Sequence, residues 1–152
     1  MNWKSTNLLD DTGLKLLAEL QANARLSYTE LGNRVGLSTP AVTERIRKLE
    51  DAGIITGYHA RVDFEKIGLP ITALVNIKEL GWERTEEKMD QIERMPEVVE
   101  IYRTTGDDSM IIKVVAPAMD QLNSIVCRLS KLGTPTMSLV RGKPFIKNGK
   151  EL

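Results

Sequence analysis

Residues 38–48 combine short hydroxyl-bearing side chains with basic ones, and this combination can read DNA. Serine and threonine at the start of a helix can approach base edges, while arginine can pair with guanine or with a phosphate. The helix N-terminus adds free amides and a partial positive charge that suit a phosphate. The sequence therefore predicts a DNA-contacting surface formed by Tyr28, Arg34, Ser38, Thr39, Pro40, Thr43, Glu44, Arg45, Arg47 and Lys48.

Two helices joined by a tight turn would present these side chains. Ser27 and Glu30 form a capping box at the start of the first helix, and Gly36 ends it because glycine adopts a left-handed backbone at little cost. Ser38 offers a second N-cap, and Pro40 falls in the first turn of the second helix. The buried stripe of that helix is predicted to be Val42, Ile46 and Leu49. A helix upstream completes a three-helix unit through Leu14, Leu16, Leu17 and Leu20.

A surface helix with ordinary solvated charges is the alternative interpretation of the same residues. The chain has 21 basic and 21 acidic residues, so its formal net charge is zero, whereas many DNA-binding proteins are basic. DNA binding would then depend on how charges are arranged and on pairing two modules in a dimer, and it should depend on salt. The basic residues expected near one face are Arg34, Arg45, Arg47, Lys48 and Arg61.

The chain, at 152 residues, is long enough for two small domains. We expect a winged helix-turn-helix domain over residues 1–62, in which two short extended pieces around Gly57 make a small hairpin or wing. Residues 63–70 read as a linker because Gly68 and Pro70 interrupt any regular element. Residues 71–152 form the second domain.

Alternating apolar residues mark the first strand of the second domain, over residues 71–78. A helix begins at Thr85 and ends at Pro96, with Met89, Ile92 and Met95 facing inward. Strands at 98–103 and 110–115 form a hairpin, and a helix over 118–132 precedes a last strand over 136–140. The order βαββαβ predicts a ferredoxin-like α+β fold.

The face of this sheet away from the helices should carry enough apolar surface to need a cover. An exposed apolar patch of that kind marks an interaction site, so we predict a homodimer formed through the sheet. The residues expected on this face are Leu74, Val98, Tyr102, Ile111 and Val115.

Several functions are disfavoured by the residues that the sequence contains. There is no nucleophile–base pair, no metal-ligand cluster and no phosphate loop, so we expect no enzyme, no cofactor and no metal. The lone His59 is an ordinary surface residue, and the lone Cys127 is expected to be a buried, inert thiol in an apolar helix. RNA binding by the sheet would need exposed aromatic rings, and Tyr102 is almost the only one available. Without a membrane-spanning run or a signal segment, a soluble, cytoplasmic protein is expected.

The chain resembles the Lrp/AsnC family of bacterial and archaeal transcription regulators from about residue 9 to about residue 140. No single motif is specific to the family, but the order and spacing of the motifs along nearly the full length of the chain are specific. The motifs that carry the resemblance are Leu16-Leu17-x-x-Leu20-Gln21, Arg25-Leu26-Ser27, Glu30-Leu31, Val35-Gly36-Leu37-Ser38, Arg45-Ile46-x-x-Leu49-Glu50, Gly53-Ile54-Ile55-x-Gly57-Tyr58, Ile67-Gly68-Leu69 and Thr105-Gly106-Asp107.

The resemblance implies an N-terminal winged helix-turn-helix and a C-terminal ferredoxin-like domain of the RAM/AsnC type. Family members dimerise through that domain, often assemble into tetramers or octamers, and many bind an amino acid near the loop between the second and third strands. In that loop, free amides could take a carboxylate and an aspartate could hold an ammonium; a hairpin turn without ligand is the alternative. The effector-binding residues implied here are Thr104, Thr105, Gly106, Asp107, Asp108, Thr136 and Ser138.

Two departures from the family pattern alter these expectations. Gly13 stands where the family commonly has an aspartate early in the first helix, so we expect that helix to start late or fray. Asp108-Ser109 replaces an aromatic residue followed by an aspartate, so the effector could be a basic amino acid or no amino acid at all. The favoured hypothesis is a sequence-specific regulator that binds double-stranded DNA and responds to a small-molecule effector.

Overall fold

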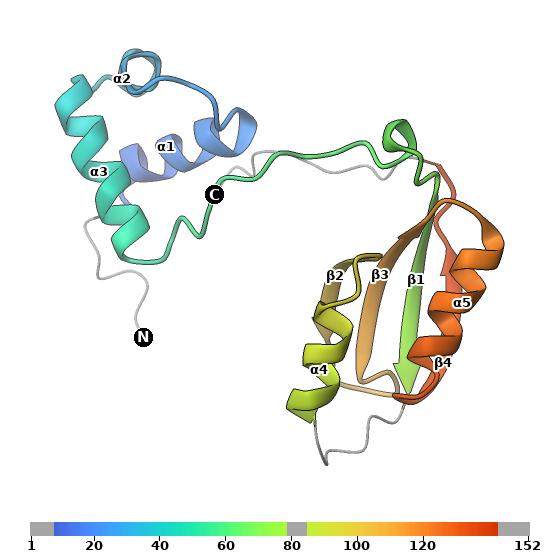
Figure 1. Ribbon diagram of the computed structural model, residues 1–152. Coiled ribbons are helices and arrows are strands. Elements are labelled where there is room, and N and C mark those ends of the chain that lie inside the picture. Colours follow the sequence, from blue (N-terminus) through green and yellow to red (C-terminus); the bar gives the residue numbers. More distant parts are fainter. Residues whose placement is uncertain (1–7, 79–84, 143–152) are drawn as a thin grey trace. The chain divides into compact units, whose positions relative to one another are not determined.

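A computed structural model describes residues 8–78 and 85–142 of the chain (Figure 1). The described residues form two compact units, one ending at Ala60 and the other beginning at Arg61. Each unit has its own hydrophobic core.

The first unit consists of three helices, α1 (Asp11–Ala22), α2 (Tyr28–Val35) and α3 (Thr39–Asp51). Its core is apolar: Leu16, Leu20, Leu31, Val42 and Ile46 are buried together, which confirms the stripe expected on the third helix. Of the four leucines expected along the first helix, Leu14 and Leu17 are only half-buried. The capping box of α2 is present in both directions, and Gly36 ends the helix with a left-handed φ of 73°. These local signals therefore set the ends of α2 as the sequence predicts.

The start of α1 differs from expectation: the helix neither begins late nor lacks a cap. Asp10 is its N-cap, and the Asp10 carboxylate accepts a hydrogen bond from the amide of Gly13 at 2.8 Å. Glycine is required at this place because a Cβ on Gly13 would lie 1.8 Å from the carbonyl oxygen of Leu8. The missing side chain lets the preceding segment cross the first turn of the helix.

The segment after α3 forms no hairpin, so that detail of the expected wing is wrong. Within the described residues 54–62 there is neither helix nor strand. This segment is instead tied back to α3, because the Tyr58 hydroxyl donates a hydrogen bond to Glu50 at 2.9 Å.

The second unit is a four-stranded antiparallel sheet with two helices on one face (Figure 1). A short 3-10 turn, η2 (Glu65–Ile67), lies in the segment expected to be a linker. The elements that follow are β1 (Ile71–Lys78), α4 (Thr85–Glu93), β2 (Val98–Arg103), β3 (Met110–Ala116), α5 (Met119–Leu129) and β4 (Thr134–Leu139). The order of these elements along the chain confirms the βαββαβ prediction. Within the sheet, the strands lie in the order β2-β3-β1-β4.

The core of this unit lies between the helices and the inner face of the sheet. Every second residue of the two central strands is buried there, including Val75 and Ile112. The inward residues predicted for the helices are found as expected: Ile92, Leu122, Ile125 and Leu129 are buried.

The other face of the sheet, here called the open face, is more polar than predicted. A register irregularity between Val98 and Glu100 turns Val98 toward the core, so its placement on the open face was wrong. Glu100 lies on the open face instead and forms an ion pair with Lys113 at 2.7 Å. Leu74 and Tyr102 remain on the open face and are exposed.

Cys127 also differs from expectation, because it is exposed on α5 and not buried. In the described ranges, no group of three or more histidine, cysteine, aspartate or glutamate residues could hold a metal ion. None of the helices in this part of the chain is long and apolar enough to cross a membrane.

Candidate functional site

The turn between α2 and α3 brings the two helices into close contact. The amide of Leu37 donates to the carbonyl of Gly32 at 2.9 Å, and a Cβ on Gly32 would lie 2.5 Å from the carbonyl oxygen of Leu37. The hydroxyls of Thr29 and Thr39 lie 3.3 Å apart, one on each helix. This packing fixes the direction in which α3 begins.

The outer face of α3 carries most of the predicted DNA-contacting residues. Because Val42, Ile46 and Leu49 point into the core, the remaining positions face outward. Ser38 is the N-cap but makes no side-chain capping hydrogen bond, so the first amides of α3 have no side-chain cap and stay available to an anion. Tyr28, at the start of α2, is 40% exposed. The predicted DNA-contacting residues that are exposed at the N-cap and along α3 are Ser38, Thr39, Pro40, Thr43, Glu44, Arg47 and Lys48.

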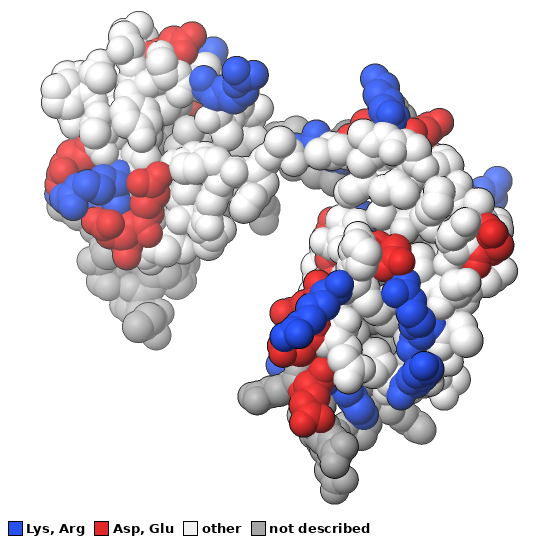
Figure 2. Space-filling model, viewed as in Figure 1, with Lys and Arg blue, Asp and Glu red and all other residues white. Residues whose placement is uncertain are grey.

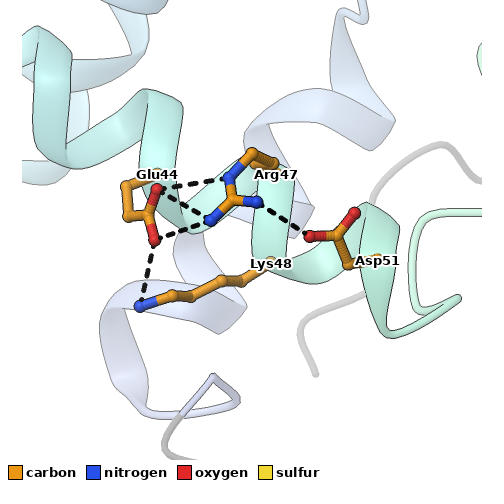
Figure 3. A network of polar contacts seen from close by, with 4 residues as sticks. All are labelled: Glu44, Arg47, Lys48 and Asp51. Atoms are coloured by element: carbon orange, nitrogen blue, oxygen red, sulfur yellow. Dashed lines mark hydrogen bonds and ion pairs between the residues drawn. The ribbon is translucent and has the colours of Figure 1, made fainter.

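Arg47 and Lys48 are both paired with carboxylates of the same helix (Figure 3). The Arg47 guanidinium donates to both oxygens of Glu44, at 3.1 and 3.3 Å, and to Asp51 at 3.3 Å. The Lys48 ammonium lies 3.3 Å from Glu44. Hydrogen bonds from Arg47 and then from Lys48 hold the pKa of Glu44 below its usual value, so this carboxyl is charged at neutral pH.

Arg45 and Arg34 are paired as well, but with residues of α1 or its cap. Arg45 forms two hydrogen bonds with Asp10, at 2.7 and 2.8 Å, and its side chain is only 29% exposed. Arg34 lies 2.6 Å from Glu19. Acidic and basic side chains accordingly lie side by side on the surface of this unit (Figure 2).

The partners of these cations were not identified from the sequence. Asp10 is an N-cap residue directly before an apolar-periodic helix, which is a local signal that could have been read. The partnerships with Asp10 and Glu19 join residues far apart in sequence and follow from the packing of α1 against the other helices.

The predicted effector loop, residues 104–109, joins β2 to β3 and is anchored to the end of β1. The amide and the hydroxyl of Ser109 both donate to the carbonyl of Ile77, at 2.9 and 3.0 Å. The Thr104 hydroxyl donates to the carbonyl of Asp108 at 2.5 Å, which closes the loop. Gly106 sits at the exposed tip with a φ of 114°, a conformation that side-chain-bearing residues rarely adopt.

Asp108 is held at the inner side of this loop by a residue that the sequence did not reveal. Asn76 of β1 donates from its side-chain amide to Asp108 Oδ2 at 2.9 Å. The other oxygen, Oδ1, is buried without a hydrogen-bond partner. Burying a carboxylate oxygen without a hydrogen-bond partner is costly.

The remaining predicted effector residues lie on β4 or at the loop tip. Thr136 of β4 is the register partner of Asn76, and Ser138 pairs with Leu74 two residues further along. Both hydroxyl residues are exposed, as are Thr105 and Asp107. The sheet thus brings Asn76 beside Thr136 in register, and Asn76 in turn contacts Asp108.

Two family models match the chain, and together they cover both units. Residues 9–56 match a winged helix-turn-helix DNA-binding domain, and residues 72–137 match the Lrp/AsnC ligand binding domain.

Similar proteins match over nearly the full length of the chain. The uncharacterised HTH-type transcriptional regulator YezC of Bacillus subtilis is 38% identical over 132 residues, which are 87% of this chain and 93% of YezC. The solved structure of LrpC from B. subtilis matches with a TM-score of 0.84 at 30% identity, covering 91% of this chain and 99% of that one. A transcriptional regulator of Neisseria meningitidis, solved as a complex with L-Met, matches with a TM-score of 0.83 at 28% identity and covers 95% and 96% of the two chains.

Proposed function

The chain belongs to the Lrp/AsnC family of transcriptional regulators, and we propose that it binds operator DNA sequence-specifically in response to an amino acid or a related small metabolite. The observation that carries the proposal is the outward row of hydroxyl and basic side chains on α3, which follows an N-terminus without a side-chain cap. A helix of this kind fits the major groove, with its first residues against the bases.

On the DNA side, each predicted contact has a distinct part. Thr39 and Thr43 face base edges from the first turns of α3, and Arg47 reaches a guanine or a phosphate. Arg45 acts through its pair with Asp10, which holds α3 against the cap of α1. Tyr28 and Arg34, both exposed on α2, lie close to the phosphate backbone.

On the effector side, Asp108 binds the ammonium group of the ligand through its unpaired Oδ1. Asn76 orients the carboxylate, and the amides around Gly106 take the ligand's carboxylate. The complex of the N. meningitidis regulator with L-Met supports an amino acid as the ligand class.

The assembly we propose is a homodimer formed through the open face of the sheet, with further association into a tetramer or octamer. Leu74 and Tyr102 are the exposed apolar groups that a partner would cover. A dimer presents two copies of α3 to half-sites about one helical turn apart. Because the effector loop and the sheet share one unit, ligand and DNA affinities are linked through the assembly.

Two measurements test this function. The first is a gel-shift titration on a duplex enriched from a random pool by the wild-type protein; replacing Arg47 by alanine should weaken binding by about tenfold or more. The second is light scattering combined with thermal-shift screening of the twenty amino acids. A strictly monomeric protein that enriches no duplex even at low salt would overturn the proposal.

A further inference from the structure

The basic groups on the outer face of α3 are neutralised within the helix itself. Glu44 forms ion pairs with both Arg47 and Lys48, and Asp51 forms a second ion pair with Arg47 (Figure 3). All four side chains are about half exposed or more, so water and a ligand can reach the network. The charges of α3 balance, with Arg45, Arg47 and Lys48 against Glu44, Glu50 and Asp51.

The pairing differs in kind from that of Arg45. The bond between Arg45 and Asp10 is bidentate, short and partly shielded, and it joins two segments of the fold. The contacts of Glu44 are 3.1–3.3 Å long, lie on a single helix and are exposed to solvent. Exposed pairs of this kind contribute little to stability, so they can exchange for other partners at small cost.

We propose that Glu44 is a specificity-determining residue, which neutralises Arg47 and Lys48 in the free protein and penalises DNA that offers it no hydrogen-bond donor. This inference rests on the proposed function, since it assumes that α3 enters the major groove. Any duplex must replace the carboxylate partners of both cations with phosphates or base edges. Glu44 itself then lies close to the phosphate backbone, where its charge is repelled.

Operator DNA can compensate for this repulsion, whereas arbitrary DNA cannot. A glutamate carboxylate in the major groove accepts a hydrogen bond from the amino group of cytosine. In a DNA sequence that places a cytosine opposite Glu44, this hydrogen bond offsets the repulsion between the carboxylate and the phosphates. Other sequences lack the hydrogen bond and bind weakly. Discrimination against wrong sequences is thus built from a repulsive element as well as from attractive contacts.

The test compares Glu44→Gln with Glu50→Gln in the full-length protein. Both changes remove one negative charge from α3, but Glu50 accepts its hydrogen bond from the neutral Tyr58 hydroxyl. Fluorescence anisotropy is measured across a salt series on two duplexes: one enriched by the wild-type protein from a random pool, and a scrambled duplex of the same composition.

Glu44→Gln should bind the scrambled duplex about fivefold more tightly, because the phosphates no longer repel a carboxylate at this position and the exposed ion pairs no longer have to be exchanged. The slope of log K against log salt should steepen by about 1 per module. The affinity ratio between enriched and scrambled duplex should fall, whereas Glu50→Gln leaves it near the wild-type value. Asp51→Asn, which removes one carboxylate partner of Arg47 and leaves Glu44 in place, should act in the same direction and more weakly.

Failure of the inference and failure of the proposed function are distinguishable. If wild-type protein enriches a duplex but Glu44→Gln keeps the wild-type ratio and slope, or changes them only as much as Glu50→Gln does, the role of Glu44 is refuted. If no variant binds either duplex at low salt, the proposed function itself fails. A change in the thermal midpoint alone, without a change in ratio, would indicate a purely structural pair and would equally overturn the inference.

Discussion

The guanidinium of Arg45 in α3 forms two parallel hydrogen bonds with the carboxylate of Asp10, at 2.7 and 2.8 Å. The same carboxylate accepts the amide of Gly13 at 2.8 Å and so caps α1. One aspartate therefore connects the N-terminus of the first helix to the middle of the third. This connection and the apolar core beneath it hold the direction of α3, the helix that we propose to contact DNA.

The Arg45–Asp10 pair should make the stability of the first unit depend on acid pH. The hydrogen bond from Arg45, followed by that from the Gly13 amide, lowers the pKa of Asp10 from 3.8 to about 2. A lowered carboxyl pKa gives stability that is present above the unfolded pKa of about 4 and is lost as pH falls through the folded value. The loss should therefore occur between about pH 4 and pH 2.

Replacing Arg45 by methionine should raise the pKa of Asp10 toward 3.8 without reaching it, because the Gly13 amide remains. Carboxyl NMR titration measures the pKa, and acid unfolding monitored by circular dichroism should show a smaller pH-dependent loss. Arg34→Met is the matched control, because Arg34 pairs with Glu19 and not with Asp10. An unchanged Asp10 pKa in the Arg45 variant would contradict the pairing.

Gly13→Ala should destabilise the protein although alanine favours helices. The added Cβ would meet the Leu8 carbonyl at 1.8 Å, so the chain before α1 must shift. Overpacking of this kind costs about 1–3 kcal/mol, which exceeds the gain of about 1 kcal/mol in helix propensity. Urea denaturation measures the difference, with Lys15→Ala at an exposed position of α1 as control. A more stable Gly13→Ala protein would show that the crossing segment adapts freely.

The phenol of Tyr58 should ionise unusually late. Partial desolvation of its half-exposed ring, and then its hydrogen bond to Glu50, raises the pKa of Tyr58 to about 12. Glu50→Gln should lower this pKa only in part, because desolvation is the larger cause. Absorbance titration of tyrosinate, with Tyr28 and Tyr102 replaced by phenylalanine, isolates the group. Ionisation near the ordinary value of 10.0 would show that the segment after α3 leaves the helix in solution.

Leu74→Glu should weaken the proposed dimer. Leu74 lies on the open face of β1, where a partner sheet would bury it. Burying an unpaired carboxylate in an interface should raise the dimer dissociation constant by about tenfold or more. Sedimentation or light scattering over a dilution series reports the change. Met119→Glu, at an exposed apolar residue of α5, should leave the assembly unaltered; equal effects of the two variants would rule out the open face as the interface.

The elements of both units could be predicted because their signals are local. The capping box at Ser27, the left-handed Gly36 and the apolar spacing of α3 each involve a few neighbouring residues. The order of strands and helices along the second unit was predicted from the alternation of apolar residues in the strands and their helical spacing between the strands. Each of these signals involves residues of one helical turn or one strand, so it can be recognised without knowing the fold.

The errors concern properties that local patterns do not determine. Val98 turns inward because one irregular residue pair shifts the alternation of β2, and nothing in the residue types marks that shift. Cys127 follows the buried Ile125 by two residues, a rotation of roughly 200° around the helix, which places it outside. The apolar character of cysteine was therefore not enough to predict on which face of α5 this residue lies.

The site was predicted in outline, whereas its supporting contacts required the fold. Exposed residues of α3 were located from the buried stripe alone. Asp10 and Asn76, by contrast, meet Arg45 and Asp108 across 35 and 32 residues. Contacts between residues so far apart in sequence can be identified only when the packing of the helices and the register of the strands are known.

Asp108 and Asp107 should differ sharply in their effect on the ligand, although they are adjacent. Asp107 is exposed at the loop tip, whereas Asp108 is oriented by Asn76 and has one buried, unpaired oxygen. A charged hydrogen bond to an ammonium group is worth about ten- to a hundredfold in affinity, so Asp108→Asn should weaken an amino-acid ligand by that factor. Asp107→Asn removes the same charge one residue away and should change affinity little. Calorimetry with each variant, using the amino acid that gives the largest thermal shift with wild-type protein, measures both. If Asp107→Asn instead caused the larger loss, the ligand would bind at the loop tip, and the buried oxygen of Asp108 would require another explanation.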